Sequence, residues 1–303
     1  MRTPFTGVGT AIVTPFTTTG LLDEDAVRRL ARRQIDEGVH FLVPCGTTGE
    51  SPTLSDEERT RVVEICVHEA RGKVPVLAGA GGYDTREVIH AARRFERAGA
   101  NGLLSVTPYY NKPTPDGLIQ HYTAIAESTS LPIVLYNVPG RTGCNIDPAT
   151  LVKLSAIPTV IGVKEASGNI QQMCEICRAV PPDFIVLSGD DAITLPLMAV
   201  GGRGVISVAS NEVPREMSQM VEAAERGDFA AARSIHATLL PLMLVNFVES
   251  NPIPVKAAMA AMGLLDESYR LPMVPPRSES RAKILKTLAE MGLLNKSAAK
   301  VSA

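Results

Sequence analysis

The hydrophobic pattern along the chain alternates short apolar runs with amphipathic helical stretches. Eight runs rich in β-branched residues are long enough for strands and too short for helices. Most are apolar on both faces, which is typical of parallel strands covered by helices. The predicted strands span residues 7–16, 39–46, 75–81, 102–108, 131–139, 160–167, 184–190 and 204–210.

Helix signals fall between these runs. Ser55 followed by Glu58 has the spacing of a capping box, and Asp84 followed by Glu87 repeats it. Gly99 can end the second of these helices in the left-handed conformation. A regular succession of eight strands and helices predicts a (β/α)8 TIM barrel. A doubly wound open sheet is the alternative, but the regular succession favours closure.

No strand pattern follows residue 226. Helical patterns cover 229–248, 254–262 and 280–291, and proline-rich segments connect them. We therefore predict a catalytic barrel over 1–226 and a C-terminal helical region over 227–303. This region would pack on the barrel or on a neighbouring subunit.

Composition narrows the class of protein. The 303 residues carry a net charge of −2, so there is no excess of basic residues that would indicate binding to nucleic acid or to a membrane surface. No apolar run approaches a membrane span and no signal-peptide pattern begins the chain, so we expect a cytoplasmic protein. The five scattered cysteines argue against a disulfide framework, and the absence of a close histidine pair argues against a metal site.

One charged residue, Lys164, interrupts the apolar strand 160–167. A buried ammonium is costly unless it is paired, and desolvation favours the neutral amine. At pH 7.4 an ordinary lysine is neutral in only about one molecule in a thousand. A lysine on a rigid apolar strand is therefore a candidate nucleophile for a carbonyl. Alternatively, its head reaches solvent or pairs with Glu165.

In a barrel, active residues lie at the C-terminal ends of strands and in the loops that follow. The segment GTTGES (46–51) offers backbone N–H groups to an anion and hydroxyls for proton transfer, or is a simple capped turn. Tyr109 and Tyr110 end another strand and point in different directions. At least one can face a partner, although surface packing is the alternative.

Tyr136 would lie on the strand next to Lys164, where its phenol could transfer protons. The alternative is a core tyrosine with a satisfied hydroxyl. Arg141 lies on a glycine-flanked loop at the predicted mouth of the barrel. The forked donors of its guanidinium suit a carboxylate. The alternative is an ordinary surface arginine. Glycines in 187–191 and 204–210 would let a small substrate approach the backbone.

Six motifs in register carry a family resemblance: GTTGES (46–51), TPYYN (107–111), LYNVPGRTG (135–143), GVKEASG (162–168), LSGDD (187–191) and GVISV (204–208). Together they resemble the dihydrodipicolinate synthases, within the pyruvate-dependent lysine aldolase family that also holds N-acetylneuraminate lyase. The similarity covers nearly the whole chain, including NPIPVK (251–256).

The resemblance implies a catalytic set. By position, Lys164 resembles the Schiff-base lysine and Tyr136 the general acid/base. Thr47 resembles the hydroxyl that links this tyrosine to a second one. In this chain the second tyrosine is Tyr110, and the family supplies it across a subunit interface.

The resemblance also implies the substrate contacts. Thr48 and Ile206 match the positions that hold pyruvate, and Gly189 lines the same pocket. Arg141 matches the arginine that binds the carboxylate of aspartate semialdehyde, and it separates this branch from the lyase branch. Relatives that free lysine inhibits often have an asparagine where this chain has Tyr83, and a histidine where it has Arg59 or Asp56. This chain therefore departs from the lysine-inhibited members.

The implied protein is a lyase of lysine and diaminopimelate biosynthesis that condenses pyruvate with L-aspartate 4-semialdehyde to give 4-hydroxy-tetrahydrodipicolinate. It needs no metal or organic cofactor, and the family is commonly a homotetramer. The alternatives are a pyruvate aldolase acting on a sugar acid or another 2-keto acid, and a non-catalytic barrel that binds a keto acid.

Overall fold

The fold, given by a computed structural model that describes residues 5–294, contains all eight predicted strands. Each strand lies inside its predicted run but is shorter, because the runs extend into the turns that follow. The strands are β1 (Gly7–Ala11), β2 (Phe41–Val43), β3 (Leu77–Gly79), β4 (Gly102–Val106), β5 (Ile133–Asn137), β6 (Val160–Glu165), β7 (Ile185–Ser188) and β8 (Gly204–Ser207).

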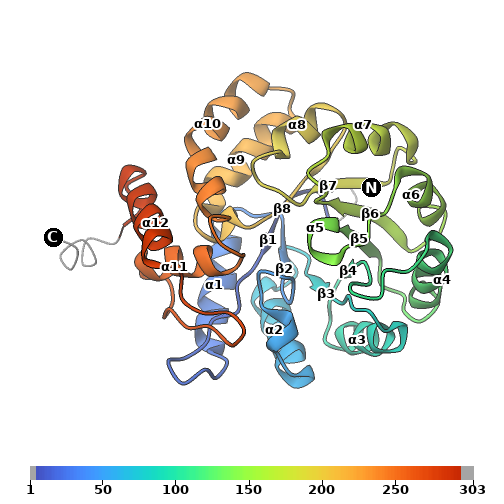
Figure 1. Cartoon of the computed structure of the whole chain (residues 1–303), viewed down its shortest axis with the longest axis horizontal. Helices are drawn as coiled ribbons and strands as arrows, with labels where there is room; N and C mark the ends of the chain where they lie inside the picture. The colour runs from blue at the N-terminus through green and yellow to red at the C-terminus, as the bar shows by residue number, and fades with distance from the viewer. Residues whose placement is uncertain (1–4, 295–303) are drawn as a thin grey trace.

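The strands form a nearly closed barrel. They pair in parallel in the order β2-β1-β8-β7-β6-β5-β4-β3. The two outer strands of this order are joined by a parallel bridge between Leu42 and Val76, and the Gly79 amide donates to the Pro44 carbonyl at 2.9 Å. Helices surround the barrel (Figure 1), so the TIM-barrel prediction is confirmed over the open sheet.

Helix boundaries follow the predicted caps. The Ser55 hydroxyl accepts from the Glu58 amide while the Glu58 carboxylate accepts from the Ser55 amide, a complete capping box. The Asp84 carboxylate instead accepts from the amide of Arg86, so the second predicted box is a single cap. The helices around the barrel are α1 (Glu24–Asp36), α2 (Asp56–Ala70), α3 (Thr85–Arg97), α4 (Pro115–Ala126), α5 (Pro139–Thr142), α6 (Pro148–Leu154), α7 (Ile170–Ala179), α8 (Thr194–Ala199) and α9 (Pro214–Glu225), with short 3-10 helices η1 (Ser51–Thr53) and η2 (Ala209–Asn211).

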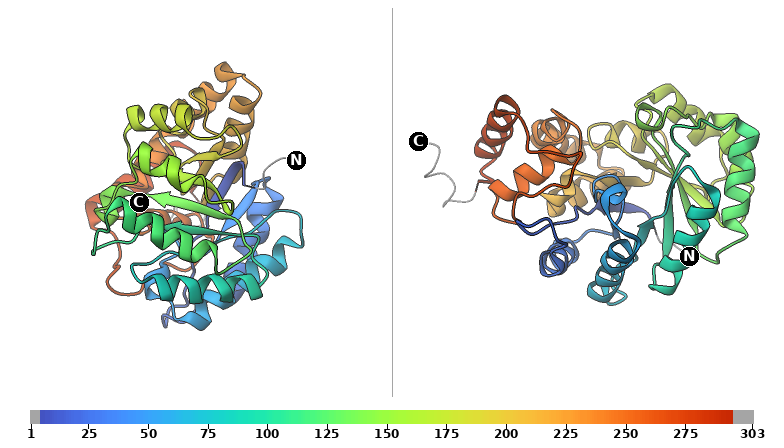
Figure 2. Two further views of the ribbon diagram at one scale, coloured as in Figure 1. Left: turned by 90° about the vertical axis from the view of Figure 1, so that its right-hand side faces the viewer. Right: turned by 60° about the horizontal axis from the view of Figure 1, so that its bottom comes forward.

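Between residue 227 and the last described residue, 294, lie the three predicted helices: α10 (Phe229–Val245), α11 (Ile253–Ala261) and α12 (Ser278–Glu290). Helix α10 packs along α9, and α12 packs against α10 and α11. Figure 2 shows this region at one side of the barrel. The division of the chain at residue 226 stays a prediction, and residues 295–303 of the proposed region lie outside the described part.

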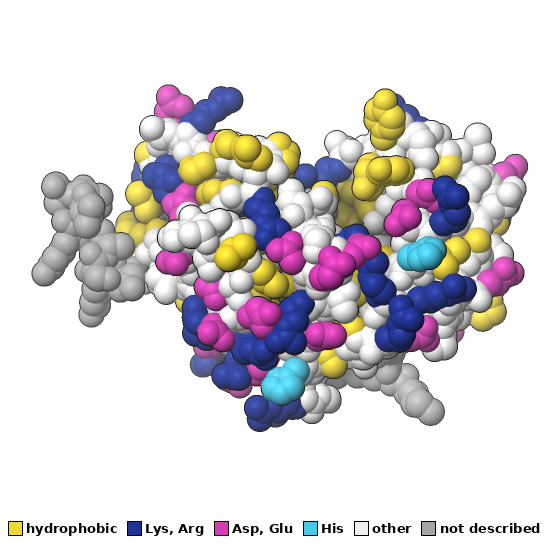
Figure 3. Space-filling model, turned by 90° about the horizontal axis from the view of Figure 1, so that it is seen from below, with side chains coloured by type: hydrophobic (Ala, Val, Ile, Leu, Met, Phe, Trp, Pro, Cys, Tyr) yellow, Lys and Arg dark blue, Asp and Glu magenta, His cyan; other side chains and the backbone are white. Residues whose placement is uncertain are grey.

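Two apolar layers hold the molecule together. One lies between the barrel and its helices and continues into the C-terminal region. The other fills the barrel interior and includes Leu104, Tyr136, Leu187 and Ile206. Basic and acidic side chains are interspersed over the face in Figure 3. Within residues 5–294, no helix combines the length and apolar character needed to cross a membrane.

Candidate active site

The strand register brings two predicted catalytic residues together. Tyr136 on β5 is the direct partner of Lys164 on β6. Both side chains are buried, and Nζ of Lys164 lies 4.3 Å from the centroid of the Tyr136 ring. Tyr136 belongs to the apolar cluster inside the barrel. Its direct partner on the neighbouring strand faces the same side of the sheet, so both side chains point into the barrel. The predicted neighbourhood of Lys164 and Tyr136 is confirmed.

The structure decides between the two interpretations of Lys164. Its side chain is 6 % exposed, which rules out a head that reaches bulk solvent. Glu165 follows it on the strand and therefore points to the opposite face, where its carboxylate accepts from the amide of Ser167 at 2.7 Å. Within residues 5–294, no ion pair joins Lys164 to a carboxylate. A buried amine without a carboxylate partner suits Schiff-base chemistry.

A polar network on the outer face fixes these two strands. Asn137 donates from Nδ2 to Oε2 of Glu165 at 2.9 Å and to Oδ1 of Asn145 at 2.9 Å. The Ile146 amide donates to Oδ1 of Asn137, and Gln172 on α7 donates to Glu165 at 3.4 Å. A satisfied buried network specifies one geometry. It therefore fixes the register that presents the lysine and the tyrosine on the inner face.

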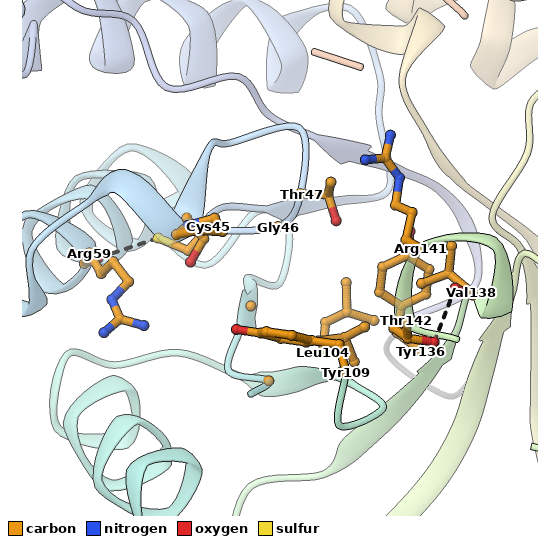
Figure 4. Close-up of a pocket in the computed structure, with 15 residues that line it drawn as sticks. Cys45, Gly46, Thr47, Arg59, Leu104, Tyr109, Tyr136, Val138, Arg141 and Thr142 are labelled. Atoms are coloured by element: carbon orange, nitrogen blue, oxygen red, sulfur yellow. Dashed lines mark hydrogen bonds between the residues drawn. The ribbon is translucent and has the colours of Figure 1, made fainter. Parts of the chain in front are cut away.

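A cavity opens at the C-terminal ends of the strands, and three predicted site residues line it: Thr47, Tyr136 and Arg141. Its volume of about 280 Å³ lies near the lower end for ligand sites, which suits small substrates. Figure 4 shows Thr47 and Arg141 on one side of the cavity, with Leu104 and Tyr109 across from them. No hydrogen bond joins the Tyr136 and Thr47 hydroxyls in the described chain.

Thr48 is buried, does not line the cavity, and is hydrogen-bonded to Asn251, for which no role is predicted. Nδ2 of Asn251 donates to Oγ1 of Thr48 at 2.9 Å, and the Asn251 carbonyl accepts from Nη2 of Arg141 at 3.4 Å. Asn251 therefore connects two predicted substrate contacts. It belongs to the NPIPVK motif, which was the only signal that could have indicated it.

Gly189 lies close to the lysine, and Ile206 lies in the barrel interior. A Cβ built on Gly189 would come within 3.1 Å of Cε of Lys164 and 2.5 Å of Cβ of Ala166, so only glycine fits there. Ile206 belongs to the same interior cluster as Tyr136. Within residues 5–294, no group of three or more His, Cys, Asp or Glu side chains could hold a metal ion.

The adjacent tyrosines point in different directions, as predicted. Tyr109 lines the cavity and its ring meets Tyr83 edge-on at 5.2 Å. Tyr110 is 91 % exposed with a left-handed backbone (φ 71°), and it does not reach the cavity of its own chain. Arg59 also lines the cavity, and its guanidinium binds Asp56. Two of the residues that depart from the lysine-inhibited pattern therefore pair with each other.

Comparisons with known proteins agree over nearly the whole chain. The model of the dihydrodipicolinate synthetase family matches residues 4–291. A 4-hydroxy-tetrahydrodipicolinate synthase of Koribacter versatilis is 53 % identical over 289 residues, covering 95 % of this chain and 96 % of that protein. The dihydrodipicolinate synthase structure from Thermotoga maritima superposes with a TM-score of 0.94 at 45 % identity, covering 96 % of this chain and 100 % of that one.

A third relative carries a ligand. The chloride-inhibited dihydrodipicolinate synthase from Acinetobacter baumannii, complexed with pyruvate, superposes with a TM-score of 0.94 at 40 % identity. The match covers 95 % of this chain and 99 % of that one.

Proposed function

The chain belongs to the dihydrodipicolinate synthetase family, and from this premise we propose that it condenses pyruvate with L-aspartate 4-semialdehyde to give 4-hydroxy-tetrahydrodipicolinate. It is a class I aldolase-type lyase, which acts through a lysine Schiff base. The observation that carries the assignment to Lys164 is its buried, unpaired amine beside the Tyr136 ring. The reaction belongs to lysine and diaminopimelate biosynthesis.

The reaction begins when the neutral amine of Lys164 attacks the ketone carbon of pyruvate. Loss of water from the adduct gives an iminium, which acts as the electron sink when the methyl group loses a proton. The resulting enamine attacks the aldehyde carbon, forming the new C–C bond while the aldehyde oxygen takes up a proton. The amino group of the second substrate then attacks the imine carbon, which closes the ring and releases Lys164.

Each step moves a proton, and Tyr136 is the proposed general acid/base. Thr47 would connect it to Tyr110 of a second copy of the chain. Support for the second copy comes from Tyr110 itself, because an exposed tyrosine with left-handed backbone has no function in its own chain's cavity. We therefore propose a homotetramer built from dimers that exchange this residue.

The substrate contacts divide by chemistry. Thr48 would donate its hydroxyl to the carboxylate of pyruvate, since its oxygen already accepts from Asn251. Ile206 and Gly189 would shape the space beside the Schiff base. Arg141 would bind the carboxylate of the aldehyde substrate through its forked donors. As the proposed location we keep the cytoplasm, where free cysteines such as the five of this chain are typical.

Reductive trapping tests the proposal. Borohydride added with pyruvate should reduce the iminium and add mass to the peptide that contains residue 164. Without pyruvate, the same treatment should leave this peptide unchanged. Labelling of another lysine, or of none, would remove Lys164 from the mechanism.

The alternatives need a separate assay. Turnover with aspartate semialdehyde, coupled to a downstream reductase, supports the synthase. Cleavage of a sugar acid without this turnover would indicate the related aldolase activity. Saturable pyruvate binding without any turnover would indicate a keto-acid-binding barrel.

A further inference from the structure

A second lysine in this chain is even more deeply buried than Lys164. Lys256 on α11 is fully buried, and its Nζ donates to Oε1 of Glu50 at 2.6 Å and to the Thr14 carbonyl at 3.0 Å. The same ammonium lies 4.4 Å from the centroid of the Phe16 ring. A fully paired cation is not available as a nucleophile, so Lys256 has a different role from Lys164.

Stability alone is a weak reason for this pair. Desolvation of two buried charges can exceed their attraction, and well-packed apolar residues often stabilise a fold as well. Burial lowers the pKa of Lys256, and the neighbouring Glu50 carboxylate opposes that shift. A buried ion pair of good geometry is better explained by what it holds in place.

What the pair holds is the turn that carries two predicted site residues. Glu50 directly follows Thr47, Thr48 and Gly49. Its backbone is left-handed, with φ 51°, a conformation that residues other than glycine rarely adopt. Its amide donates to the Thr47 carbonyl at 3.0 Å, and its carbonyl accepts from the Thr53 amide at 3.0 Å. The left-handed residue therefore closes the turn on both sides.

We propose that Lys256 is a positioning residue for pyruvate binding: its ammonium anchors Glu50, and Glu50 holds the turn that places Thr47 in the cavity wall and fixes its buried neighbour Thr48. The helical C-terminal region thereby takes part in substrate binding although its lysine touches no substrate. This inference rests on the proposed function of the two threonines.

The test is the double variant Lys256→Met/Glu50→Gln, which removes both charges while keeping the side-chain lengths. We expect the pyruvate KM to rise about tenfold or more, and kcat at saturating pyruvate should fall with it because the same turn carries Thr47 of the proposed relay. Glu50→Asp is the second variant: it keeps both charges and withdraws the carboxylate by one methylene, and it should raise the same KM. An unchanged pyruvate KM in either folded variant would overturn the inference.

Leu288→Ala is the stability control, because Leu288 is buried in α12 and lies in the same C-terminal region. It should lower the melting temperature and leave the pyruvate KM unchanged. A KM that rises equally in this control would mean that the region matters only through stability. Borohydride trapping at saturating pyruvate separates the two proposals: absent labelling of residue 164 in the parent contradicts the proposed function, whereas normal labelling with an unchanged KM contradicts only this inference.

Discussion

At the scale of single residues, two buried lysines have opposite environments. Both lie beside an aromatic ring, but Lys256 pairs with Glu50 whereas Lys164 has no carboxylate partner in the described chain. The difference follows from strand alternation, which turns Glu165 away from its neighbour. The amine of Lys164 is thus left without a carboxylate partner, and Tyr136, whose ring centroid lies 4.3 Å from Nζ, is the proposed group that moves its protons.

Tyr136→Phe should therefore lower turnover by roughly 10² to 10⁴, because it removes the phenol and keeps the ring. The measurement is kcat at saturating concentrations of both substrates. Tyr122→Phe is a matched control, since Tyr122 is fully buried and its hydroxyl donates to the Ser105 carbonyl outside the cavity. It should lower stability by about 1 kcal/mol and leave kcat unchanged. Equal kcat in the two variants would contradict the assignment.

Glu212 predicts a pH dependence of stability. Burial raises its pKa to about 8, and its Oε1 atom has no partner while Oε2 accepts from Asn246. Between the ordinary value of 4.5 and about 8, the folded state keeps a proton that the unfolded chain has lost. The free energy of unfolding should therefore fall as pH rises through this window, by at most about 1.4 kcal/mol per unit.

Glu212→Gln imitates the protonated acid and should flatten this dependence. Urea unfolding from pH 5 to pH 9, at one protein concentration, measures it. The variant should match the parent at pH 5 and exceed it at pH 8. Parallel curves for the two proteins would show that Glu212 does not titrate in this range.

At the scale of elements, the site residues come from the ends of several strands, and short segments hold them there. Helix α5 is four residues long and ends at Gly143 in the left-handed conformation (φ 68°). Inside it, the Thr142 hydroxyl donates to the Val138 carbonyl at 3.2 Å, and the Cys144 amide donates to the same hydroxyl at 3.1 Å. The amide of Arg141 donates to the Val138 carbonyl at 2.9 Å, and Arg141→Ala keeps this bond, so α5 should stay intact.

Arg141→Ala should lose condensation while formation of the pyruvate adduct survives. Borohydride labelling of residue 164 measures the first step, and the coupled assay measures the second. Arg86→Ala serves as the control, because Arg86 is an exposed arginine on α3 that pairs with Asp84 away from the cavity. Loss of labelling together with turnover in Arg141→Ala would mean that α5 is needed for the structure of the site.

At the scale of the whole molecule, one chain does not contain its complete proposed site. Tyr110 is exposed and does not line the cavity of its own chain, so in the proposed relay a second copy would supply this tyrosine. Symmetric exchange is natural in a dimer with a two-fold axis, because each copy then completes the other. If Tyr110 is exchanged in this way, the dimer within the proposed homotetramer is needed for activity.

Mixing two inactive variants tests this exchange. Tyr110→Phe and Lys164→Ala should each lose turnover, but in a mixed dimer one site combines an intact Lys164 with an intact Tyr110. Random mixing should recover up to about a quarter of the parent activity. Light scattering checks that both variants assemble like the parent. No recovery after demonstrated subunit exchange would place Tyr110 outside the relay.

The sequence determined the barrel, because eight apolar runs separated by capped helices have few ways to bury both faces of each strand. It also indicated Lys164, Tyr136, Thr47 and Arg141, since a charged or polar residue at the end of an apolar strand is conspicuous. Only the tertiary structure decided which buried charges find partners. The pairing of Lys256 with Glu50 and the contact of Asn251 with Thr48 join residues about 200 positions apart. Local sequence patterns do not show which residues so far apart in the chain come into contact. The closure of the barrel and the packing of the C-terminal helices decide these contacts.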